Sequence, residues 1–257
     1  MKVATWNVNS IRVRLPRLLA WLEAQRPDVI CLQEIKVASE AFPVDALAGA
    51  GYHAVVNGQR TYHGVAILSR EPASEVVLGL GDGGDDSQAR LAAARIGGLR
   101  VLSAYVPNGG EVGSDKFAYK LEWLARLRAH LETHASPQEP LLLCGDLNVA
   151  PDDRDVAHPE AWKDTVLCHS DARAALRRVL DWGLIDTFRQ QHAEGGFYSW
   201  WDYRQLGFPR NDGLRIDHIL ATAPLAKRCT GASIDRAERK GKQPSDHAPV
   251  IAIFDAP

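Results

Sequence analysis

The chain has 257 residues, of which 46% are hydrophobic and 24% are charged, and these values exclude a disordered protein. The formal net charge is −2, so a polyanion would have to bind a local basic patch or a metal ion rather than the surface as a whole. The four cysteines are widely spaced and include no CxxC pair, which excludes a zinc ribbon and a disulfide framework.

The same composition bears on where the protein works. The longest apolar runs are far shorter than the ~20 residues of a membrane-spanning helix. The opening MKVATWNVNSI has neither the apolar stretch nor the cleavage site of a signal peptide. Unpaired cysteines fit a reducing compartment. We therefore expect a cytoplasmic protein without a membrane partner and, since no long apolar surface stripe is evident, a monomer.

The first half of the chain is predicted to be rich in strands. Apolar and β-branched runs bounded by turn residues predict strands at residues 2–8, 28–35, 52–57, 64–69, 75–80, 89–96 and 99–107. Between the first two strands, a helix with Pro16 in its first turn is predicted by the spacing of Leu15, Leu18, Leu19 and Leu22. The acidic segment 81–86 lacks the spacing and closing Glu of a calcium loop, so a solvated turn is expected.

The second half contains the longest predicted helix, at residues 114–134, whose apolar face carries Phe117, Leu121, Leu124 and Leu131. Helical spacing returns at residues 171–182, after an irregular loop predicted at 150–169. Further strands are predicted at residues 141–149, 197–203, 215–221 and 249–254. No repeat or linker divides the chain, so the pattern predicts one α/β domain over residues 1–257, with two packed sheets and outer helices.

Polar side chains gather where the predicted strands end. Any one of them could simply cap a helix or form a turn, but six strand ends with the same feature indicate an active site. The residues concerned are Asn7, Asn9, Glu34, Tyr105, Asn108, Asp146, Asn148, Asp217, Asp246 and His247.

These residue types point to metal-assisted hydrolysis of a phosphate ester. Carboxylates and amides supply the oxygen ligands that Mg²⁺ or Mn²⁺ prefers. Glu34 can anchor the metal, while Asp146 can orient or deprotonate water. His247 can donate to a phosphate oxygen, and Asp217 can hold its imidazole in the useful orientation. The motifs HExxH, GxSxG and GxxxxGK[ST] are absent, so other common hydrolytic and nucleotide-binding sites are not indicated.

At these residues the chain resembles the exonuclease III family of apurinic/apyrimidinic (AP) endonucleases, within the endonuclease/exonuclease/phosphatase superfamily. The resemblance runs from the first predicted strand to the last. Short pieces such as LQE and SDH are shared across the superfamily, whereas WWDYR and LRIDHIL, combined with YVPNG, are specific to its DNA-repair branch. The matching segments are TWNVNSIR (5–12), DVICLQEIK (28–36), YHGVAILS (62–69), AYVPNG (104–109), CGDLNVAPDDRDV (144–156), FYSWWDYR (197–204), GLRIDHIL (213–220) and PSDHAPV (244–250).

The resemblance implies a four-layered α/β sandwich, in which two packed mixed β-sheets are flanked by helices. It also implies dependence on Mg²⁺ or Mn²⁺ and a substrate of double-stranded DNA with abasic sites or blocked 3′ ends. The implied activities are cleavage 5′ to abasic sites, 3′-phosphodiesterase and 3′-phosphatase activity, and 3′→5′ exonuclease activity.

The resemblance assigns roles to the residues at the predicted strand ends. Metal-site roles fall on Asn7, Glu34 and Asp246. Catalytic roles fall on Tyr105, Asp146, Asn148, Asp217 and His247. Asn9 and Asn108 fall on the side that binds DNA, and Asn9 is the residue usual in the bacterial branch.

Further DNA contacts are predicted around this site. The candidate phosphate contacts are Arg60, Tyr62, Arg204, Arg210, Arg239, Lys240 and Lys242. By resemblance, Trp200 and Leu214 line a pocket for the sugar that lacks a base, while Trp201 packs in the core. His158 and His169, in the predicted loop, are expected to be exposed or at the edge of the DNA rather than metal ligands.

Two other functions remain open at this point. A phosphatase or phosphodiesterase acting on inositol phosphates or lipids would share the catalytic acids but should lack WWDYR. A DNA-binding protein without catalysis would have lost one of Glu34, Asp146, Asp217 or His247, and all four are present.

Overall fold

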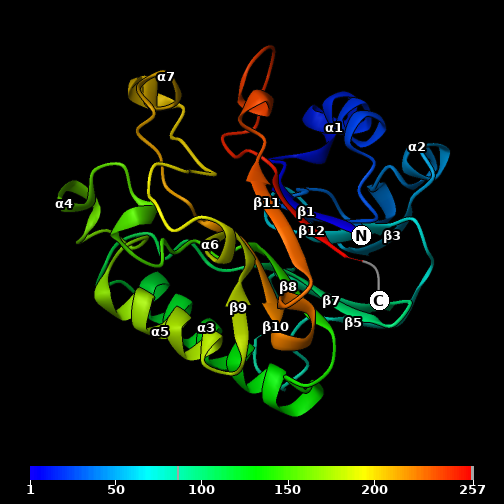
Figure 1. Cartoon of the computed structure of the whole chain (residues 1–257), viewed down its shortest axis with the longest axis horizontal. Coiled ribbons are helices and arrows are strands. Elements are labelled where there is room, and N and C mark those ends of the chain that lie inside the picture. The colour runs from blue at the N-terminus through cyan, green and yellow to red at the C-terminus, as the bar shows by residue number, and fades with distance from the viewer. Residues whose placement is uncertain (86, 256–257) are drawn as a thin grey trace.

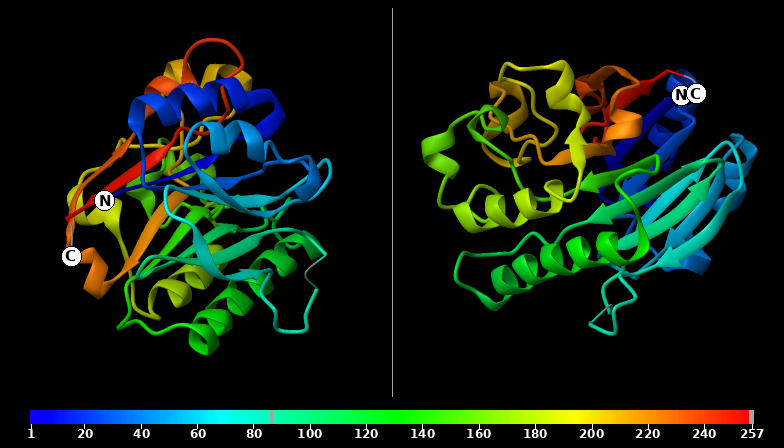
Figure 2. Two further views of the ribbon diagram at one scale, coloured as in Figure 1. Left: turned by 90° about the vertical axis from the view of Figure 1, so that its right-hand side faces the viewer. Right: turned by 60° about the horizontal axis from the view of Figure 1, so that its bottom comes forward.

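Two mixed β-sheets lie face to face, and helices cover both outer surfaces (Figure 1). This computed structural model describes residues 1–85 and 87–255. Turning the molecule shows the four layers in order, with α1 and α2 on one side and α3 and α5 on the other (Figure 2). The predicted four-layered α/β sandwich is confirmed.

The first sheet has the strand order β11-β12-β1-β2-β4-β3. Among the described residues of this sheet, β1 and β2 form the one parallel pair of neighbouring strands. The other neighbouring strands are antiparallel. The strands are β1 (Lys2–Asn7), β2 (Val29–Gln33), β3 (His53–Asn57), β4 (Val65–Ser69), β11 (Cys229–Ile234) and β12 (Val250–Phe254).

The second sheet has the strand order β5-β6-β7-β8-β10-β9. Here β7 and β8 form the parallel pair, and the remaining neighbours are antiparallel. The strands are β5 (Ala73–Leu78), β6 (Leu91–Ile96), β7 (Leu99–Tyr105), β8 (Leu141–Asp146), β9 (Leu184–Asp186) and β10 (Asp217–Thr222).

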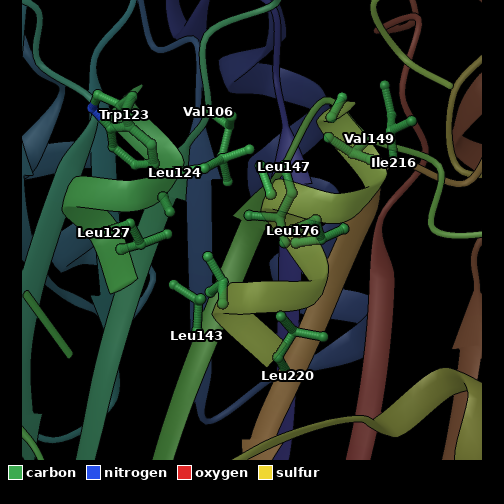
Figure 3. Close-up of a cluster of buried hydrophobic side chains, with 14 of the residues drawn as sticks. Val106, Trp123, Leu124, Leu127, Leu143, Leu147, Val149, Leu176, Ile216 and Leu220 are labelled. Carbon is green, nitrogen blue, oxygen red and sulfur yellow. The ribbon is translucent and has the colours of Figure 1, made fainter. Parts of the chain in front are cut away.

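Alternation along the strands divides most buried side chains among three cores, and a fourth, smaller cluster forms around Trp201. In β1, Val3 faces the core between the sheets, whereas Ala4 and Trp6 face the core beneath helix α1 (Ile11–Gln25). The third core lies between the second sheet and two helices, α3 (Asp115–His134) and α5 (Ser170–Leu180). Figure 3 shows this core, in which leucines of both helices meet Leu143 and Leu220 of the strands.

Close approach of the parallel strands explains a glycine beside one catalytic candidate. Gly145 precedes Asp146 at the end of β8 and has a φ of 150°. A Cβ at this position would lie 1.9 Å from the carbonyl oxygen of Ala104 on β7. Only glycine therefore allows β7 and β8 to pair up to the residue that enters the site.

Most predicted elements are present, with ends that differ by a few residues. The helix predicted at 114–134 is α3, and it begins after Ser114, whose hydroxyl caps the amide of Phe117. Lys120 and His130 are buried on its inner face, which the leucine spacing did not indicate. In α1 the helix begins at Ile11, so Pro16 lies in the second turn rather than the first.

The strand predicted at 197–203 is wrong. This segment forms only isolated bridges, in which Trp200 pairs with Leu214 and with His247. The amides of Ser199 and Trp200 both donate to the carbonyl of Leu214, and the Ser199 hydroxyl accepts two further amides, so no regular ladder forms. Aromatic content suggests a strand, but hydrogen bonds between Ser199 and the distant residues Ile216 and Asp217 take the place of a regular ladder.

Several short elements were not predicted. The predicted loop at 150–169 contains a 3-10 turn (Asp153–Asp155) and helix α4 (Pro159–Trp162). Also unpredicted are β9, β11, α2 (Val44–Gly49), α6 (Thr187–Gln191), α7 (Gly207–Arg210), α8 (Ala223–Ala226), and 3-10 turns at Ser39–Ala41, Arg204–Leu206 and Arg236–Arg239. Residues 82–84 of the predicted acidic turn form bends, and Asp86 lies outside the described residues. Across residues 1–85 and 87–255, none of the helices combines the length and apolar character needed to cross a membrane.

Candidate active site

Strand directions bring the predicted residues to one edge of the two sheets. The parallel strands β1 and β2 end at Asn7 and just before Glu34, and β7 and β8 end at Tyr105 and Asp146. Strands β10 and β12 run the opposite way, so they begin at this edge. Asp217, the first residue of β10, therefore lies directly opposite Asp146 in the ladder.

The side-chain amide of Asn7 joins the two sheets at this edge. Its Nδ2 donates to Oε1 of Glu34 over 2.8 Å and to Oδ2 of Asp146 over 2.9 Å. Its Oδ1 accepts from the amide of Asn9. Asn7 is fully buried, so these bonds fix the positions of the two carboxylates relative to each other.

Glu34 is held in an uncommon backbone conformation. Its φ is 49°, and the amides that follow it donate to the carbonyls of Gly64 and His63. Lys36 Nζ lies 2.8 Å from Oε2 of Glu34. Burial raises the pKa of Glu34. The charge of Lys36 and the hydrogen bonds from Lys36 and Asn7 together lower it by more, so the net shift of the pKa is downward. Such strain, held by surrounding bonds, is common at functional sites.

His247 lies between two buried carboxylates. Its Nδ1 is 2.8 Å from Oδ2 of Asp217, and its Nε2 is 3.8 Å from Oδ2 of Asp146. Burial lowers the pKa of His247, but Asp217 and Asp146 raise it well above its usual value. Burial also raises the pKa of Asp146, with further increases from Asp217 and Glu34, while His247 opposes them. The imidazole is therefore charged at neutral pH and compensates its carboxylate neighbours.

The donor set fits a hard divalent cation. Among the described residues, ligand atoms of Glu34, Asp146 and His247 lie within 4.8 Å of one another. The imidazole is protonated in this arrangement, which leaves the carboxylate oxygens as the natural ligands. Asp246 lies outside this cluster and instead accepts hydrogen bonds from Asn9 and Trp200, so its assignment to the metal stays a prediction.

Tyr105 and Asn148 stand beside the two carboxylates. Burial raises the pKa of Tyr105 well above its usual value, and the charges of Glu34 and Asp146 raise it further, so its hydroxyl keeps its proton as a hydrogen-bond donor. Asn148 has a φ of 49°, and its amide donates to Oδ1 of Asp146. The exposed Asn108 donates from Nδ2 to Oδ1 of Asn148 over 3.2 Å.

The predicted DNA contacts divide into accessible and buried residues. Arg60, Tyr62 and Arg204 are exposed, although Arg204 is paired with Asp202. Arg239 is buried against Trp201, Tyr203 and Phe208, so its prediction as a phosphate contact is not supported by its position. Leu214 has no exposed surface, so its place in an open pocket stays a prediction.

The tryptophans and the loop histidines also have defined positions. Trp201 is fully buried, as expected, whereas Trp200 is partly buried and its indole donates to Asp246. His158 is exposed, and His169 caps α5 while its ring packs on Phe117. Neither histidine belongs to the carboxylate cluster formed by the described residues.

Two residues near the catalytic centre were not singled out from the sequence. Lys36 follows the LQE segment by two residues and contacts both Glu34 and Asn9. Ser199 is fully buried and donates to Oδ2 of Asp217 over 2.6 Å. The basic position of Lys36 after a metal-ligand candidate is visible in the sequence, but nothing in the spacing of Ser199 shows its link to Asp217.

A basic hollow adjoins the site. Its volume is about 510 Å³, and its lining includes the three basic side chains of Arg12, Lys36 and Arg60 and one acidic side chain, Glu40. Lys36 connects this hollow to Glu34, and a chain of rings runs from the exposed Tyr62 through His63 to Tyr105. Three cationic side chains therefore lie beside the edge of the sheets that carries the carboxylates.

Comparison with known proteins agrees with this geometry. The model of the endonuclease/exonuclease/phosphatase family matches residues 4–247. An exodeoxyribonuclease III of Haemophilus influenzae is 38% identical over 266 aligned residues, which cover 99% of this chain and 100% of that protein.

Two solved structures are similar over the full length of both chains. An AP endonuclease from Archaeoglobus fulgidus has a TM-score of 0.97 and 41% identity, and covers 100% of each chain. The 3′ phosphatase NExo from Neisseria, bound to product DNA hairpin, has a TM-score of 0.96 and 44% identity, also over 100% of each. This chain therefore belongs to the endonuclease/exonuclease/phosphatase family and is a phosphodiester hydrolase of its exonuclease III branch.

Proposed function

We propose that this nuclease repairs duplex DNA by hydrolysing the phosphodiester 5′ to abasic sites and by removing blocking groups from 3′ ends, with 3′→5′ exonuclease activity. The main support is the buried series of contacts that joins Glu34, Asn7, Asp146, His247 and Asp217 across the two sheets. Relatives named as an AP endonuclease and as a 3′ phosphatase are similar at 41% and 44% identity, so we expect both activities.

We infer that Mg²⁺ or Mn²⁺ is the cofactor. Glu34 would hold it, with Asn7 orienting that carboxylate and Asp246 as the further acid proposed for the metal site. When bound, such an ion polarises a phosphoryl oxygen and offsets its developing charge. A cation would also compensate the negative charge that raises the pKa of Asp146 in this site.

Asp146 is the proposed base for the attacking water. Its carboxylate is oriented by Asn7 and by the amide of Asn148, so both of its oxygens have fixed positions in the site. As the water oxygen bonds to phosphorus, the bond from phosphorus to O3′ breaks, and the water proton passes to Asp146. O3′ leaves as the 3′-hydroxyl of the upstream fragment once it receives a proton from solvent, and the downstream fragment keeps the phosphate at the 5′ position of its abasic sugar.

Three other side chains are proposed to hold the phosphate. His247, kept charged by Asp217, donates to an unesterified oxygen as negative charge develops there. Tyr105 donates from its hydroxyl. Asn148 orients the substrate, and Asn108, which bonds to it, contacts a neighbouring phosphate.

The basic hollow supports DNA as the substrate. Arg12, Lys36 and Arg60 can contact successive phosphates of one strand, and Tyr62 lies beside them. Arg204 and Trp200 are proposed contacts on the side of Asp246. We further propose that residues 1–257 act as one domain, as a monomer, and in the cytoplasm, where the four free cysteines stay reduced.

The proposed function is tested with three substrates and the purified full-length chain. We expect cleavage of a duplex with one tetrahydrofuran abasic analogue and release of phosphate from a 3′-phosphate nick. EDTA should abolish both activities, and Mg²⁺ or Mn²⁺ should restore them. Hydrolysis of a soluble inositol polyphosphate without cleavage of either DNA would contradict the proposal and favour the alternative phosphatase.

A further inference from the structure

Lys120 is a fully buried lysine on the inner face of α3. Its ammonium donates to main-chain carbonyl oxygens of three residues: Asn148 at 2.6 Å, Val166 at 2.6 Å and Asn108 at 3.1 Å. An ammonium group has three N–H donors and no acceptor, so these three carbonyls use its full hydrogen-bonding capacity. Its hydrogen bonds thus satisfy the backbone, rather than forming an ion pair with a carboxylate.

The three carbonyls belong to segments that are separate in sequence. Asn108 lies between β7 and α3, Asn148 follows β8, and Val166 lies in the segment between α4 and α5. Two of these segments carry side chains assigned to the site. One ammonium group therefore fixes the distance between the loops that bear Asn108 and Asn148.

The backbone at Asn148 depends on this support. Its φ is 49°, a conformation that non-glycine residues rarely adopt. Its amide bonds Asp146, its side chain bonds Val106 and Asn108, and its carbonyl bonds Lys120. Removing the last bond frees the peptide that follows Asn148, and with it the orientation of this side chain toward the phosphate.

Room for Lys120 is made by a glycine. Gly109 has a φ of 99°, and a Cβ there would lie 3.0 Å from Cδ of Lys120 and 3.3 Å from Phe117. Burial lowers the pKa of Lys120 to about 7, with Asp146 opposing the shift, which shows how unfavourable the charged form is at this position. The ammonium offsets this cost by supplying donors to three carbonyls, two of which belong to loops of the site.

We propose that Lys120 is a positioning residue for the hydrolytic reaction. Its ammonium holds the main chain of Asn108 and Asn148 so that their side chains meet the substrate phosphate in the correct geometry. This inference rests on the proposed function, since Asn148 must act on a phosphate for its position to matter. A lysine that only stabilises the fold would make a different prediction, because turnover per folded molecule would not depend on it.

The test is a double-mutant cycle in the full-length chain. Lys120→Met removes the three donors, Asn148→Ala removes the side chain that they are proposed to position, and the third variant carries both changes. The matched control is Lys116→Met, which alters an exposed lysine one turn earlier on the same helix. kcat and KM are measured on the DNA substrate that the wild type cleaves faster, and thermal unfolding and circular dichroism establish the folded fraction.

We expect kcat of Lys120→Met to fall about 10- to 100-fold per folded molecule, because misplacement by about 1 Å can cost 10²-fold in rate. KM should change less than threefold, and Lys116→Met should retain wild-type kcat. In the Asn148→Ala background, Lys120→Met should have little further effect, since the two residues act as one unit. Unchanged kcat in Lys120→Met, or losses that multiply in the double variant, would overturn the proposal.

Lys120→Met leaves three buried carbonyls without donors and could fail to fold. Lys120→Arg then decides the question, because it keeps the charge but presents a planar set of donors. We expect a folded protein with kcat reduced at least threefold, and no such reduction in the Asn148→Ala background. A folded Lys120→Arg protein with wild-type kcat would overturn the proposal. Inactive wild-type protein would instead contradict the proposed function, before any variant is compared.

Discussion

Asp146 and Asp217 occupy the same register position on the antiparallel strands β8 and β10. Like charges placed opposite each other destabilise a sheet. Here His247 lies against both carboxylates, with its ring nitrogens 3.8 Å from Asp146 and 2.8 Å from Asp217. The hydroxyl of Ser199 also donates to Asp217. The pair is therefore stable because a charged imidazole and a hydroxyl donor compensate it, and these groups are also suited to phosphate hydrolysis.

Asp146→Asn is expected to remove the base from the reaction while keeping the fold. We expect kcat to fall by roughly 10²–10⁴, the usual contribution of a general base. DNA binding, measured by fluorescence anisotropy in the presence of metal, should change much less. Circular dichroism and thermal unfolding should match the wild type. A purified, folded variant with near-normal turnover would remove Asp146 from the mechanism.

Glu34→Gln should act first on the metal requirement. A carboxylate holds a hard cation by charge, and an amide of the same shape supplies much less. The metal concentration for half-maximal activity should therefore rise by an order of magnitude or more, and excess Mg²⁺ should restore part of the activity. Glu23→Gln, an exposed change on α1, should leave the titration unaltered. If Glu34→Gln titrates like the wild type, Glu34 is not a ligand.

A buried ionic cluster next to the site predicts how stability depends on pH. Burial raises the pKa of Asp186, but Arg215 and His218 hold it well below its usual range. A carboxylate whose pKa is lower in the folded than in the unfolded state stabilises the folded protein when the pH is above the unfolded pKa, which is near 3.8. This stabilisation is lost as the pH falls from that value toward the folded pKa. The wild-type melting temperature should therefore drop steeply between pH 4 and pH 2.

Asp186→Asn tests that relationship directly. At pH 7 the variant should be less stable by about 3 kcal/mol, because Arg215 loses one charged partner in a buried site. Between pH 4 and pH 2 its melting temperature should fall less than that of the wild type. Asp45→Asn, at an exposed position on α2, should keep the wild-type slope. Equal slopes for Asp186→Asn and the wild type would contradict the assignment.

The residues of the site could be selected from the sequence because buried strands show where they end. LLLCGDLNV is apolar until Gly145, so Asp146 and Asn148 are recognisable as polar residues at a strand tip. Their contacts could not be derived in the same way. The pairing of Asp217 with Asp146 depends on β10 running antiparallel to β8, which the local pattern of either strand does not determine.

Buried polar residues were the main source of error. The leucine spacing placed Leu121 on the inner face of α3, where it packs against the core, but it did not show that the neighbouring Lys120 is fully buried. A lysine is read as a surface residue unless its acceptors are known, and the acceptors of Lys120 come from three distant segments. In the same way, FYSWWDY resembles a strand by composition, although the Ser199 hydroxyl binds amides and prevents a ladder.

The last prediction concerns how an abasic site is distinguished from intact DNA. An abasic nucleotide has no base to stack or pair, so it leaves the helix at low cost and can contact an aromatic wall beside the catalytic centre. Trp200 is suited to this role because its ring lies 6.5 Å from that of His247 and its indole donates to Asp246. Trp200→Ala should therefore lower the preference for abasic over intact duplex about tenfold. It should reduce 3′-phosphatase turnover much less, because removal of a terminal phosphate does not require an aromatic side chain against an extruded sugar. Trp200→Phe, which keeps an aromatic ring, should retain most of the preference. Both activities are measured on one folded preparation, and an equal loss of both would show that Trp200 supports the fold or the phosphate site instead.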